Sequence, residues 1–439
     1  MANPYLPLWE YIPDGEPRVF GDRVYIYGSH DRPGSDSFCD FKLKVWSASV
    51  NDLNNWVCHG HIFHTRDDRD HKSDTADWTD GYLYAPDVVE KDGKYYLFCY
   101  IMWAKGCVAV ADKPEGPFKL VNVYEYDVPE ELVGQGTFID PGVLVDDDGR
   151  NYVYCGFEKS FMCEMENNMY KMVSGSYIPD IIPVKDDPSG FFEACSPRKV
   201  GDTYYLIYSP KIGSRLDYMT SDSPTGPFVH RGTIIDNSID YPGGNDHGSI
   251  CCINGQWYIF YHKMTNGTIM SRRACVERIE MLPDGSIPQV EMTSLGFEES
   301  LNPYKITPAD IACVLKGGTF ITEYNMFTRV VTGIKNKSVI GYKYYDFGED
   351  YSTKTMELAF KVKGCGCSSV VSVYVDGEDG RKIGECKIGA DDGVYKCIVD
   401  NVTGRHSLYF VVDHAYSGAF ENMFNGRNLF ELESFVFMK

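Results

Sequence analysis

The sequence lacks the features that mark membrane, nucleic-acid-binding and secreted proteins. No apolar run in its 439 residues approaches the ~20 residues that a membrane-spanning helix requires. Basic residues are too few to balance the acidic ones, and a formal net charge of −21 disfavours nucleic acid and anionic membranes as partners. The first residues contain neither a basic segment nor an apolar segment typical of a secretory signal, so we expect a cytoplasmic protein.

The 15 cysteines form neither a disulfide framework nor a zinc-finger pattern. Their number is odd, Cys251 and Cys252 are adjacent, and one residue separates Cys365 from Cys367, which is too close for either kind of site. We therefore expect buried free thiols in a reducing compartment. No long amphipathic helix is apparent either, and this favours an all-β protein.

One short pattern, a turn followed by an aromatic-rich strand, recurs five times. The copies are GDRVYIYGS from Gly21, KDGKYYLFCY from Lys91, DDGRNYVYCG from Asp147, VGDTYYLIYS from Val200 and NGQWYIFYH from Asn254. Each combines a tight-turn signal with alternating Val, Ile, Tyr and Phe, which predicts one arm of a β-hairpin. A repeat of roughly 50 residues with several strands per unit predicts a five-bladed β-propeller, whose axis gathers side chains from every blade.

A second β-rich pattern follows the repeats, which end near Pro288. Its short β-runs cover residues 339–348, 355–364, 369–377, 406–413 and 430–437, with turn residues between them. Such spacing predicts a β-sandwich. We therefore predict an all-β chain with a five-bladed β-propeller over residues 1–300 and a jelly-roll-like β-sandwich over residues 310–439.

Three acidic residues precede the repeated hairpins by similar short distances: Asp14, Asp140 and Glu193. In equivalent blades their carboxylates would meet on one axial face. Cleavage of a glycosidic bond needs one protonated carboxyl group to donate to the leaving oxygen and one ionised carboxylate to activate water. Glu193 follows two Phe residues, an apolar setting that favours the acid. Asp14, which we expect on an open turn beside Gly15, is the candidate base.

Each of these residues also has a purely structural interpretation. Asp14 could simply form a turn, Asp140 could cap a strand or join an ion pair, and Glu193 could pair with Arg198. A non-catalytic sugar-binding propeller is therefore the alternative from a different class, and it predicts that one carboxylate points away from the others. The acidic segment 67–80 lacks the spacing and glycine of an EF-hand, so we interpret it as a charged surface loop.

These motifs resemble those of glycoside hydrolase family 43, whose members are five-bladed propellers that act on arabinose- and xylose-containing glycans. The resemblance covers roughly residues 1–295, and the matching elements are Ala85-Pro86-Asp87-Val88 followed by KDGKYYL, Ile139-Asp140-Pro141-Gly142 with Gly in place of the family's Ser, and Phe191-Phe192-Glu193-Ala194-Cys195. It implies that Asp14 is the catalytic base, Glu193 the acid, and Asp140 the residue that tunes the acid and orients substrate. Glu16 before Pro17 also looks like the family's Asp-Pro pair, but it lies two residues out of register.

The resemblance implies a mechanism and further site residues. Family members invert the anomeric centre, with acid and base ~6.5–9.5 Å apart to leave room for water. Arg272 matches the substrate-binding arginine, with Arg273 as the alternative. His247 matches the axial histidine that helps to hold a central Ca²⁺ through waters, and no organic cofactor is implied. Trp103 and Tyr84 are candidate sugar-stacking residues.

The chain after about residue 310 resembles carbohydrate-binding module family 6 in the segments IGYKYYDFG, VTGRHSLYFVV and NLFELESFVF. The family's opening Glu-x-Glu calcium motif is not evident between Gly318 and Glu323, and Ser434 replaces its usual Trp near the C-terminus. The resemblance therefore extends to the fold rather than to independent glycan binding.

The activity implied is that of an inverting exo-glycosidase that releases terminal α-L-arabinofuranose or β-D-xylose from hemicellulose-derived, arabinoxylan-type oligosaccharides. The two sugars present similar hydroxyl geometry, so one pocket can accept both. Arabinan and β-1,3-galactan stay open as alternative substrates, because the loops around the pocket decide which hydroxyl groups are recognised. The sequence does not indicate an oligomeric state.

Overall fold

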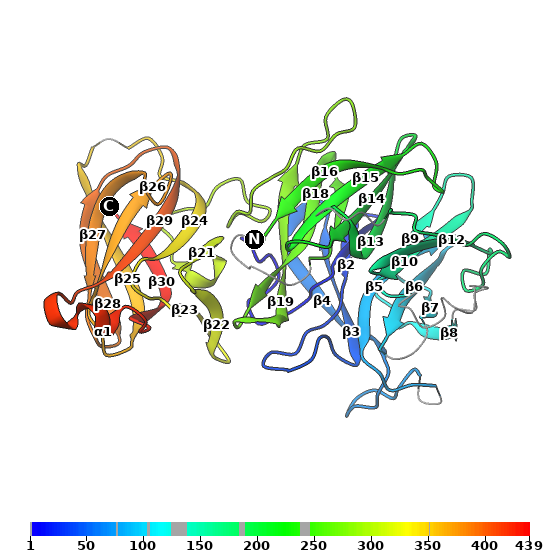
Figure 1. Ribbon diagram of the computed structural model, residues 1–439, viewed down its shortest axis with the longest axis horizontal. Helices are drawn as coiled ribbons and strands as arrows, with labels where there is room; N and C mark the ends of the chain where they lie inside the picture. The colour runs from blue at the N-terminus through cyan, green and yellow to red at the C-terminus, as the bar shows by residue number, and fades with distance from the viewer. Residues whose placement is uncertain are drawn as a thin grey trace. The chain divides into compact units, whose positions relative to one another are not determined.

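The computed structural model describes residues 2–75, 78–102, 106–123, 138–183, 189–237, 246–350 and 352–439. Within these residues nearly all regular structure is β-strand (Figure 1). The chain forms two compact units: a propeller unit of Tyr11–Met264 and Ile269–Glu291, and a sandwich unit of Met1–Glu10, Thr265–Thr268 and Met292–Lys439. The first ten residues therefore cluster with the C-terminal part of the chain, whereas the sequence-based domain limits include them in the propeller.

Five antiparallel sheets make up the propeller unit, and each contains one of the repeated hairpins. Their strands, sheet by sheet, are β1 (Glu16–Phe20), β2 (Arg23–Tyr27), β3 (Lys42–Ser49) and β4 (Asp52–His64); β5 (Leu83–Lys91), β6 (Lys94–Ile101), β7 (Cys107–Ala111) and β8 (Lys119–Val123); β9 (Gly142–Val145), β10 (Asn151–Phe157), β11 (Lys159–Met165) and β12 (Ile178–Pro179); β13 (Phe191–Val200), β14 (Thr203–Pro210), β15 (Arg215–Ser221) and β16 (Val229–Asp236); and β17 (Ser249–Ile253), β18 (Gln256–Thr265) and β19 (Thr268–Ile279). The predicted five-bladed propeller is confirmed.

The first strand of each blade lies nearest the axis, and these five strands close a ring. Strand β1 contacts both β5 and β17, and β9 contacts both β5 and β13. Ser196 of β13 and Ser249 of β17 complete the ring, because their hydroxyl groups are hydrogen-bonded at 2.7 Å. Apolar and aromatic side chains fill the space between neighbouring blades; one such core joins blades one and two around Tyr27, Phe63 and Leu97.

Register makes positions in the five first strands equivalent. One equivalent set is Glu16, Asp87, Gly142, Ser196 and Ser249, and the set two residues earlier is Asp14, Ala85, Asp140, Ala194 and His247. Residues two apart in a regular strand project from the same face, but register shifts between Tyr84 and Asp87 and between Glu193 and Ser196 interrupt this alternation in β5 and β13. The set that contains Glu16 surrounds the axis, and Asp14, Asp140 and His247 of the earlier set meet at the end where the first strands begin.

The sandwich unit consists of two sheets and very little helix. One sheet contains β22 (Phe320–Asn325), β23 (Thr328–Thr332), β30 (Phe430–Met438), β25 (Thr355–Gly364) and β28 (Gly393–Asp400), with β20 (Thr307–Pro308) also paired to β30; the other contains β21 (Val314–Lys316), β24 (Ser338–Asp346), β29 (Arg405–His414), β26 (Ser369–Val375) and β27 (Arg381–Ile388). The remaining elements are η2 (Ala309–Ile311), η3 (Gly418–Phe420) and α1 (Glu421–Phe424).

Aromatic side chains from both sheets build the core of the sandwich unit. Phe435 of β30 lies 4.8 Å from Tyr342 of β24 and 4.9 Å from Phe410 of β29, measured between ring centroids. Phe360 of β25 packs edge-on against Phe410 at 4.9 Å. Inner faces that interdigitate in this way are typical of a β-sandwich, and the predicted second fold is confirmed.

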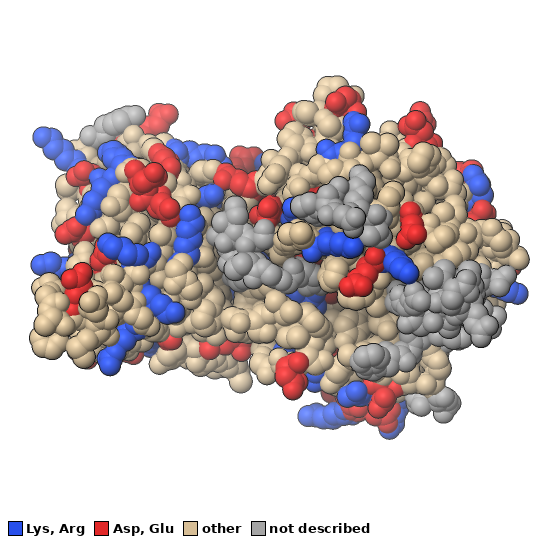
Figure 2. Space-filling model, viewed as in Figure 1, with Lys and Arg blue, Asp and Glu red and all other residues tan. Residues whose placement is uncertain are grey.

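All 15 cysteines are free, as expected, and eleven of them are buried. The expectation of burial is wrong for Cys58, Cys252 and Cys365, which are exposed, and Cys397 is partly exposed. Figure 2 shows Lys and Arg side chains interspersed with Asp and Glu over the face in view. Among the described residues, we find no helix with the length and apolar character needed to cross a membrane.

Gly142 offers a test of the axial packing. A Cβ atom at this position would lie 2.1 Å from the backbone oxygen of Cys195, which leaves no room for the family's Ser. We expect Gly142→Ala to lower the free energy of unfolding by about 1–3 kcal/mol through overpacking, measured by thermal and urea unfolding. Gly426→Ala is the control, because a Cβ atom there meets nothing within 4 Å. Wild-type stability of Gly142→Ala would contradict the close approach of β9 and β13.

Candidate active site

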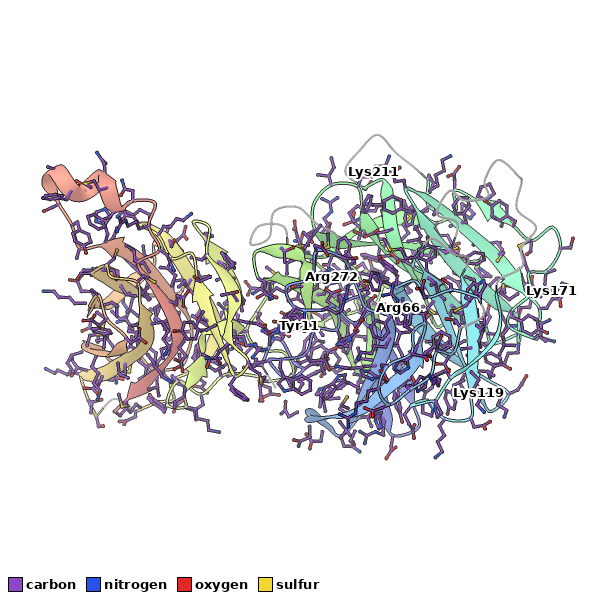
Figure 3. The ribbon with its side chains drawn as sticks, turned by 90° about the horizontal axis from the view of Figure 1, so that it is seen from below. Tyr11, Arg66, Lys119, Lys171, Lys211 and Arg272 are labelled. Atoms are coloured by element: carbon purple, nitrogen blue, oxygen red, sulfur yellow. The ribbon has the colours of Figure 1, made fainter. Side chains whose placement is uncertain are left out.

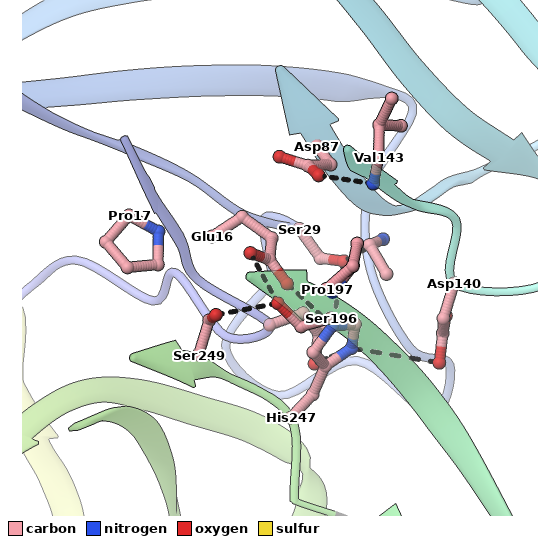
Figure 4. Close-up of polar contacts among 12 residues, drawn as sticks. Glu16, Pro17, Ser29, Asp87, Asp140, Val143, Ser196, Pro197, His247 and Ser249 are labelled. Carbon is pink, nitrogen blue, oxygen red and sulfur yellow. Dashed lines mark hydrogen bonds and ion pairs between the residues drawn. The ribbon is translucent and has the colours of Figure 1, made fainter. Parts of the chain in front are cut away.

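A buried polar cluster lies where the first strands of the blades begin. Asp14, Asp140 and His247 come from three different blades and are all almost inaccessible to solvent. The Nδ1 atom of His247 lies 3.9 Å from Oδ1 of Asp14 and 3.7 Å from Oδ2 of Asp140; Figure 4 shows the second of these contacts. The structure thus brings together three residues that the sequence singled out.

The backbone at this level of the axis adopts an unusual conformation. Four non-glycine residues of the same equivalent set have positive φ: Asp14 at 58°, Ala85 at 36°, Asp140 at 52° and Ala194 at 68°. Such values are uncommon for residues with a Cβ atom and are concentrated at functional sites. Their repetition shows that four of the five inner strands are entered through the same tight backbone bend.

Asp14 is buried, so the expectation of an open turn is wrong; the reason is that side chains from blades one and five enclose it. Its carboxylate accepts hydrogen bonds from Nη1 of Arg272 at 2.8 Å and from Oγ of Ser29 at 2.6 Å, and Nδ1 of His262 lies 3.4 Å away. Burial raises the pKa of Asp14, but Arg272, His262 and His247 outweigh it and hold the pKa well below its usual range. Asp14 is therefore ionised, as a base must be.

Arg272 is committed to neighbouring carboxylates. It projects from β19 into the interior of the propeller unit (Figure 3). Its Nε and Nη2 donate to Asp31 at 3.0 and 3.1 Å, while Nη1 reaches Asp14, and the guanidinium lies 4.9 Å from the ring centre of Phe38. These contacts make Arg272 an electrostatic partner of Asp14. Its role in binding substrate, and the competing assignment of Arg273, which is also buried, stay predictions.

Asp140 and Glu193 are linked through the backbone of β13. Asp140 accepts a hydrogen bond from the amide of Ala194, the residue after Glu193. Burial raises the pKa of Asp140 to about 6. His247 opposes this rise, and the negative charge of Asp14 adds to it. A register shift follows Glu193 in the pairing of β13 with β14. Bulges of this kind re-aim side chains next to active sites, and Glu193 itself is buried.

The next layer of the axis contains a second set of polar contacts (Figure 4). Oε2 of Glu16 accepts hydrogen bonds from Arg198 at 2.6 Å and from Ser196 at 3.0 Å. Arg198 thus pairs with Glu16 and not with Glu193. The purely structural interpretation of Glu193 required a pair between Glu193 and Arg198. The other oxygen of Glu16, Oε1, is buried without a hydrogen-bond partner and lies 3.7 Å from Nε2 of His247.

His247 is surrounded by three carboxyl groups. Burial lowers its pKa, but Glu16, Asp140 and Asp14 outweigh this effect and raise the pKa to about 9. A protonated His247 therefore balances part of the negative charge at neutral pH. The same surroundings fit a hydrated Ca²⁺ ion, because the orphaned Oε1 of Glu16 and the nearby carboxylates are the hard oxygen donors that Ca²⁺ prefers.

Of the two predicted sugar-stacking residues, only Tyr84 lies among the described residues. Tyr84 in β5 is half-buried, its hydroxyl contacts Sδ of Met102 at 3.3 Å, and its ring lies 6.0 Å from that of Tyr100. It directly precedes Ala85 of the axial set. Trp103 lies outside the described residues. The stacking role of both aromatic residues stays a prediction.

Three residues of the cluster, Ser29, Asp31 and His262, were not anticipated from the sequence. All three are fully buried. Ser29 also accepts the amide of Ala85 at 2.7 Å, so it joins blades one and two. Polar residues at the end of the repeated aromatic strand, as in YGSHD and YIFYHK, were the available signal.

The cluster separates the protonation states of two carboxyl groups. Asp14 is held ionised, whereas Asp140 keeps a proton to a pH of about 6. Carboxyl groups whose pKa values are pushed apart divide into acids and bases. Asp14 is in the state that can accept a proton from water, and Asp140, which accepts a hydrogen bond from the amide next to Glu193, is placed to influence that predicted acid.

Comparison with known proteins identifies the family. The family model "Glycosyl hydrolases family 43" matches residues 12–287. The xylosidase/arabinosidase of Thermoclostridium stercorarium is 37% identical over 93% of this chain and 95% of its own length.

Solved structures share the fold. An arabinoxylan arabinofuranohydrolase of family 43 from Bacillus subtilis, in complex with cellotetraose, superposes with a TM-score of 0.57 at 24% identity, covering 100% of this chain and 97% of that chain. A family 43 β-xylosidase/α-arabinofuranosidase from a compost metagenome, with xylotriose in a calcium-free form, gives 0.54 at 27% identity, covering 66% and 97%. With the family match and the buried carboxylates at the axis, these comparisons show that the chain belongs to glycoside hydrolase family 43 and is a glycoside hydrolase.

Proposed function

We propose that the enzyme is an inverting exo-glycosidase that releases terminal α-L-arabinofuranose and/or β-D-xylose from arabinoxylan-type oligosaccharides. The observation that carries the proposal is the convergence of Asp14 and Asp140 on His247. Glu193 is adjacent in the chain to Ala194, whose amide donates a hydrogen bond to Asp140. The sugar class is supported by the name of the Thermoclostridium relative, a xylosidase/arabinosidase. Free cysteines support a reducing compartment, and we propose a cytoplasmic enzyme that acts on imported short oligosaccharides.

In the proposed reaction Asp14 accepts a proton from water while the water oxygen forms a bond to the anomeric carbon. The bond from that carbon to the glycosidic oxygen breaks, and Glu193 donates its proton to the departing oxygen. Asp14 ends protonated and Glu193 ends ionised, and solvent exchange restores both. A single displacement inverts the anomeric centre. Asp140 tunes the acid through the amide of Ala194.

The environment of Asp14 determines when it can act as a base. Arg272 and His262 keep its carboxylate ionised in spite of burial. A buried carboxylate without such partners would take up a proton and could not accept one from water. The pair with Arg272 is therefore a requirement for the proposed mechanism at acidic and neutral pH.

The pH profile tests this requirement. Arg272→Lys keeps a positive charge but loses the planar fork that reaches both Asp14 and Asp31. The pKa of Asp14 should rise toward its ordinary value, so on the acid side kcat/KM of the variant should begin to fall at a higher pH than kcat/KM of the wild type. The sign follows because protonation of Asp14 inactivates the base. Aryl arabinofuranoside and aryl xyloside are the substrates. Arg150→Lys, at an exposed turn, should leave the acid limb in place; an unmoved limb in Arg272→Lys would refute the role.

Substrates with different leaving groups distinguish the acid from the base. Asp14→Asn and Glu193→Gln should each lower kcat/KM by ~10²–10⁴-fold. The loss in Glu193→Gln should shrink on aryl glycosides with acidic phenols, because such leaving groups need less protonation, whereas the loss in Asp14→Asn should not. Asp148→Asn, at an exposed turn, is the matched control. Wild-type rates in both variants would sink the assignment.

Product analysis separates the remaining alternatives. NMR of the first-formed sugar should show inversion, and retention would contradict the mechanism. Hydrolysis of arabinoxylan fragments in preference to arabinan ends or β-1,3-galactan would support the substrate class. Binding of these glycans without any turnover would favour the non-catalytic propeller.

We also propose that Ca²⁺ binds at the axis, held through waters by His247 and by the orphaned Oε1 of Glu16. When bound, the ion supplies positive charge to the carboxylate cluster. Chelation should lower the melting temperature, and added CaCl₂ should restore it. Glu16→Gln should weaken Ca²⁺ binding by about 10-fold, measured by calorimetry. Equal stability with and without chelator, together with no binding of Ca²⁺, would rule the ion out.

A further inference from the structure

A second group of metal-type side chains lies outside the candidate active site. It comes from β4 and the segment that follows, which extends from blade one in Figure 1. Its members are His61, His64, Asp68, His71 and Asp74. Ligand-type atoms of His61, His64 and Asp68 lie within 4.8 Å of one another, and so do those of His64, His71 and Asp74. His64 is shared by both groups.

A β-bulge places the two strand histidines on one face. Residues three apart in a regular strand project from opposite faces. In the pairing of β3 with β4, Leu43 lies opposite Phe63 but Lys44 lies opposite His61, so one extra residue is inserted between these pairs. The insertion re-phases the strand, and His61 and His64 come together with their ring centroids 5.2 Å apart.

His64 is buried without a hydrogen bond. Its side chain is 1% exposed, and neither ring nitrogen has a hydrogen-bond partner. Nε2 lies 3.4 Å from Oδ2 of Asp68, and the ring stacks on His71 with centroids 3.8 Å apart. Leaving a buried polar group unpaired is costly. An imidazole in this state, facing two further imidazoles, has the surroundings of a metal ligand.

The two aspartates are already held in position. Asp68 accepts the amide of His71 at 2.7 Å, and Asp74 accepts the amide of His64 at 2.9 Å. Oδ2 of Asp74 also lies 3.1 Å from Nε2 of His71. The chain is thus folded back so that carboxylates face the imidazoles. A surface hollow of about 450 Å³, lined by Lys42, these histidines and Asp68, gives access from solvent.

We propose that His61, His64, His71 and the carboxylates of Asp68 and Asp74 form a binding site for one divalent transition-metal ion of the Zn²⁺ type. Imidazole nitrogens with carboxylate oxygens suit Zn²⁺, whereas Ca²⁺ prefers an all-oxygen set. The ion ties β4 to the segment that leads to β5. In blade one, Glu16 at the start of β1 pairs with Tyr27 at the end of β2, and Lys42 at the start of β3 pairs with His64 at the end of β4. Strand β4 therefore ends at the axial face where β1 begins. The site is therefore a structural clamp on the active-site face, and it is independent of the proposed substrate.

Direct binding tests the proposal. Chelator-treated enzyme in excess CaCl₂, which occupies the calcium site, is titrated with ZnCl₂ in a calorimeter. We expect one Zn²⁺ per chain with micromolar affinity or tighter, and a loss of about 10-fold or more in each of His61→Gln and His71→Gln. Both residues are at least partly exposed, so folding should survive. His59→Gln on the same strand, where His59 contacts Ser47, is the matched control and should bind as the wild type does.

Limited proteolysis locates the ion independently. Trypsin can cut after Arg66, Arg69 and Lys72, which lie within the clamped segment. Zn²⁺ should slow cleavage at these three bonds several-fold in the wild type but not in His71→Gln, and Ca²⁺ alone should not protect them. Absence of saturable Zn²⁺ binding would overturn the proposal. So would binding that both substitutions leave unchanged, because the ion would then reside elsewhere.

Discussion

Charge balance at a buried axis is the constraint on which the propeller depends. Closing five blades into a ring carries Asp14, Glu16 and Asp140 out of water, and an unpaired buried carboxylate is strongly destabilising. Arginines from blades four and five, which are distant in the sequence, supply the compensating positive charge. Arg272 holds Asp14 at 2.8 Å and Arg198 holds Glu16 at 2.6 Å. Removing either arginine would leave a buried carboxylate without its cation, which is strongly destabilising.

The same balance separates the chemistry of neighbouring groups. Asp14, beside Arg272, His262 and His247, stays ionised, whereas burial raises the pKa of Asp140 to about 6. Positive φ angles at both residues fix the carboxylates at the axial end of the blades. Stability and reactivity therefore share their interactions, because the contacts that make burial tolerable also set which carboxyl group carries a proton.

Backbone irregularities within the blades position several of the side chains discussed above. A register shift follows Glu193 in β13 and lets the amide of Ala194 meet Asp140. Another shift near the end of β4 brings His61 and His64 to one face. Both sit in otherwise regular antiparallel sheets. Each changes the direction of a side chain by inserting one residue, which a strictly alternating strand cannot do.

The sequence by itself determined the blades, the sandwich and the acidic candidates, because turn chemistry and strand alternation are local and recur in every repeat. It also identified the family, through the segments around Asp140 and Glu193. Only the tertiary structure decided that Asp14 is buried, that Arg198 pairs with Glu16, and that β4 and the segment after it bring three imidazoles together. The reason is sequence distance: Asp14 and Arg272 are 258 positions apart, and only closure of the ring brings them together.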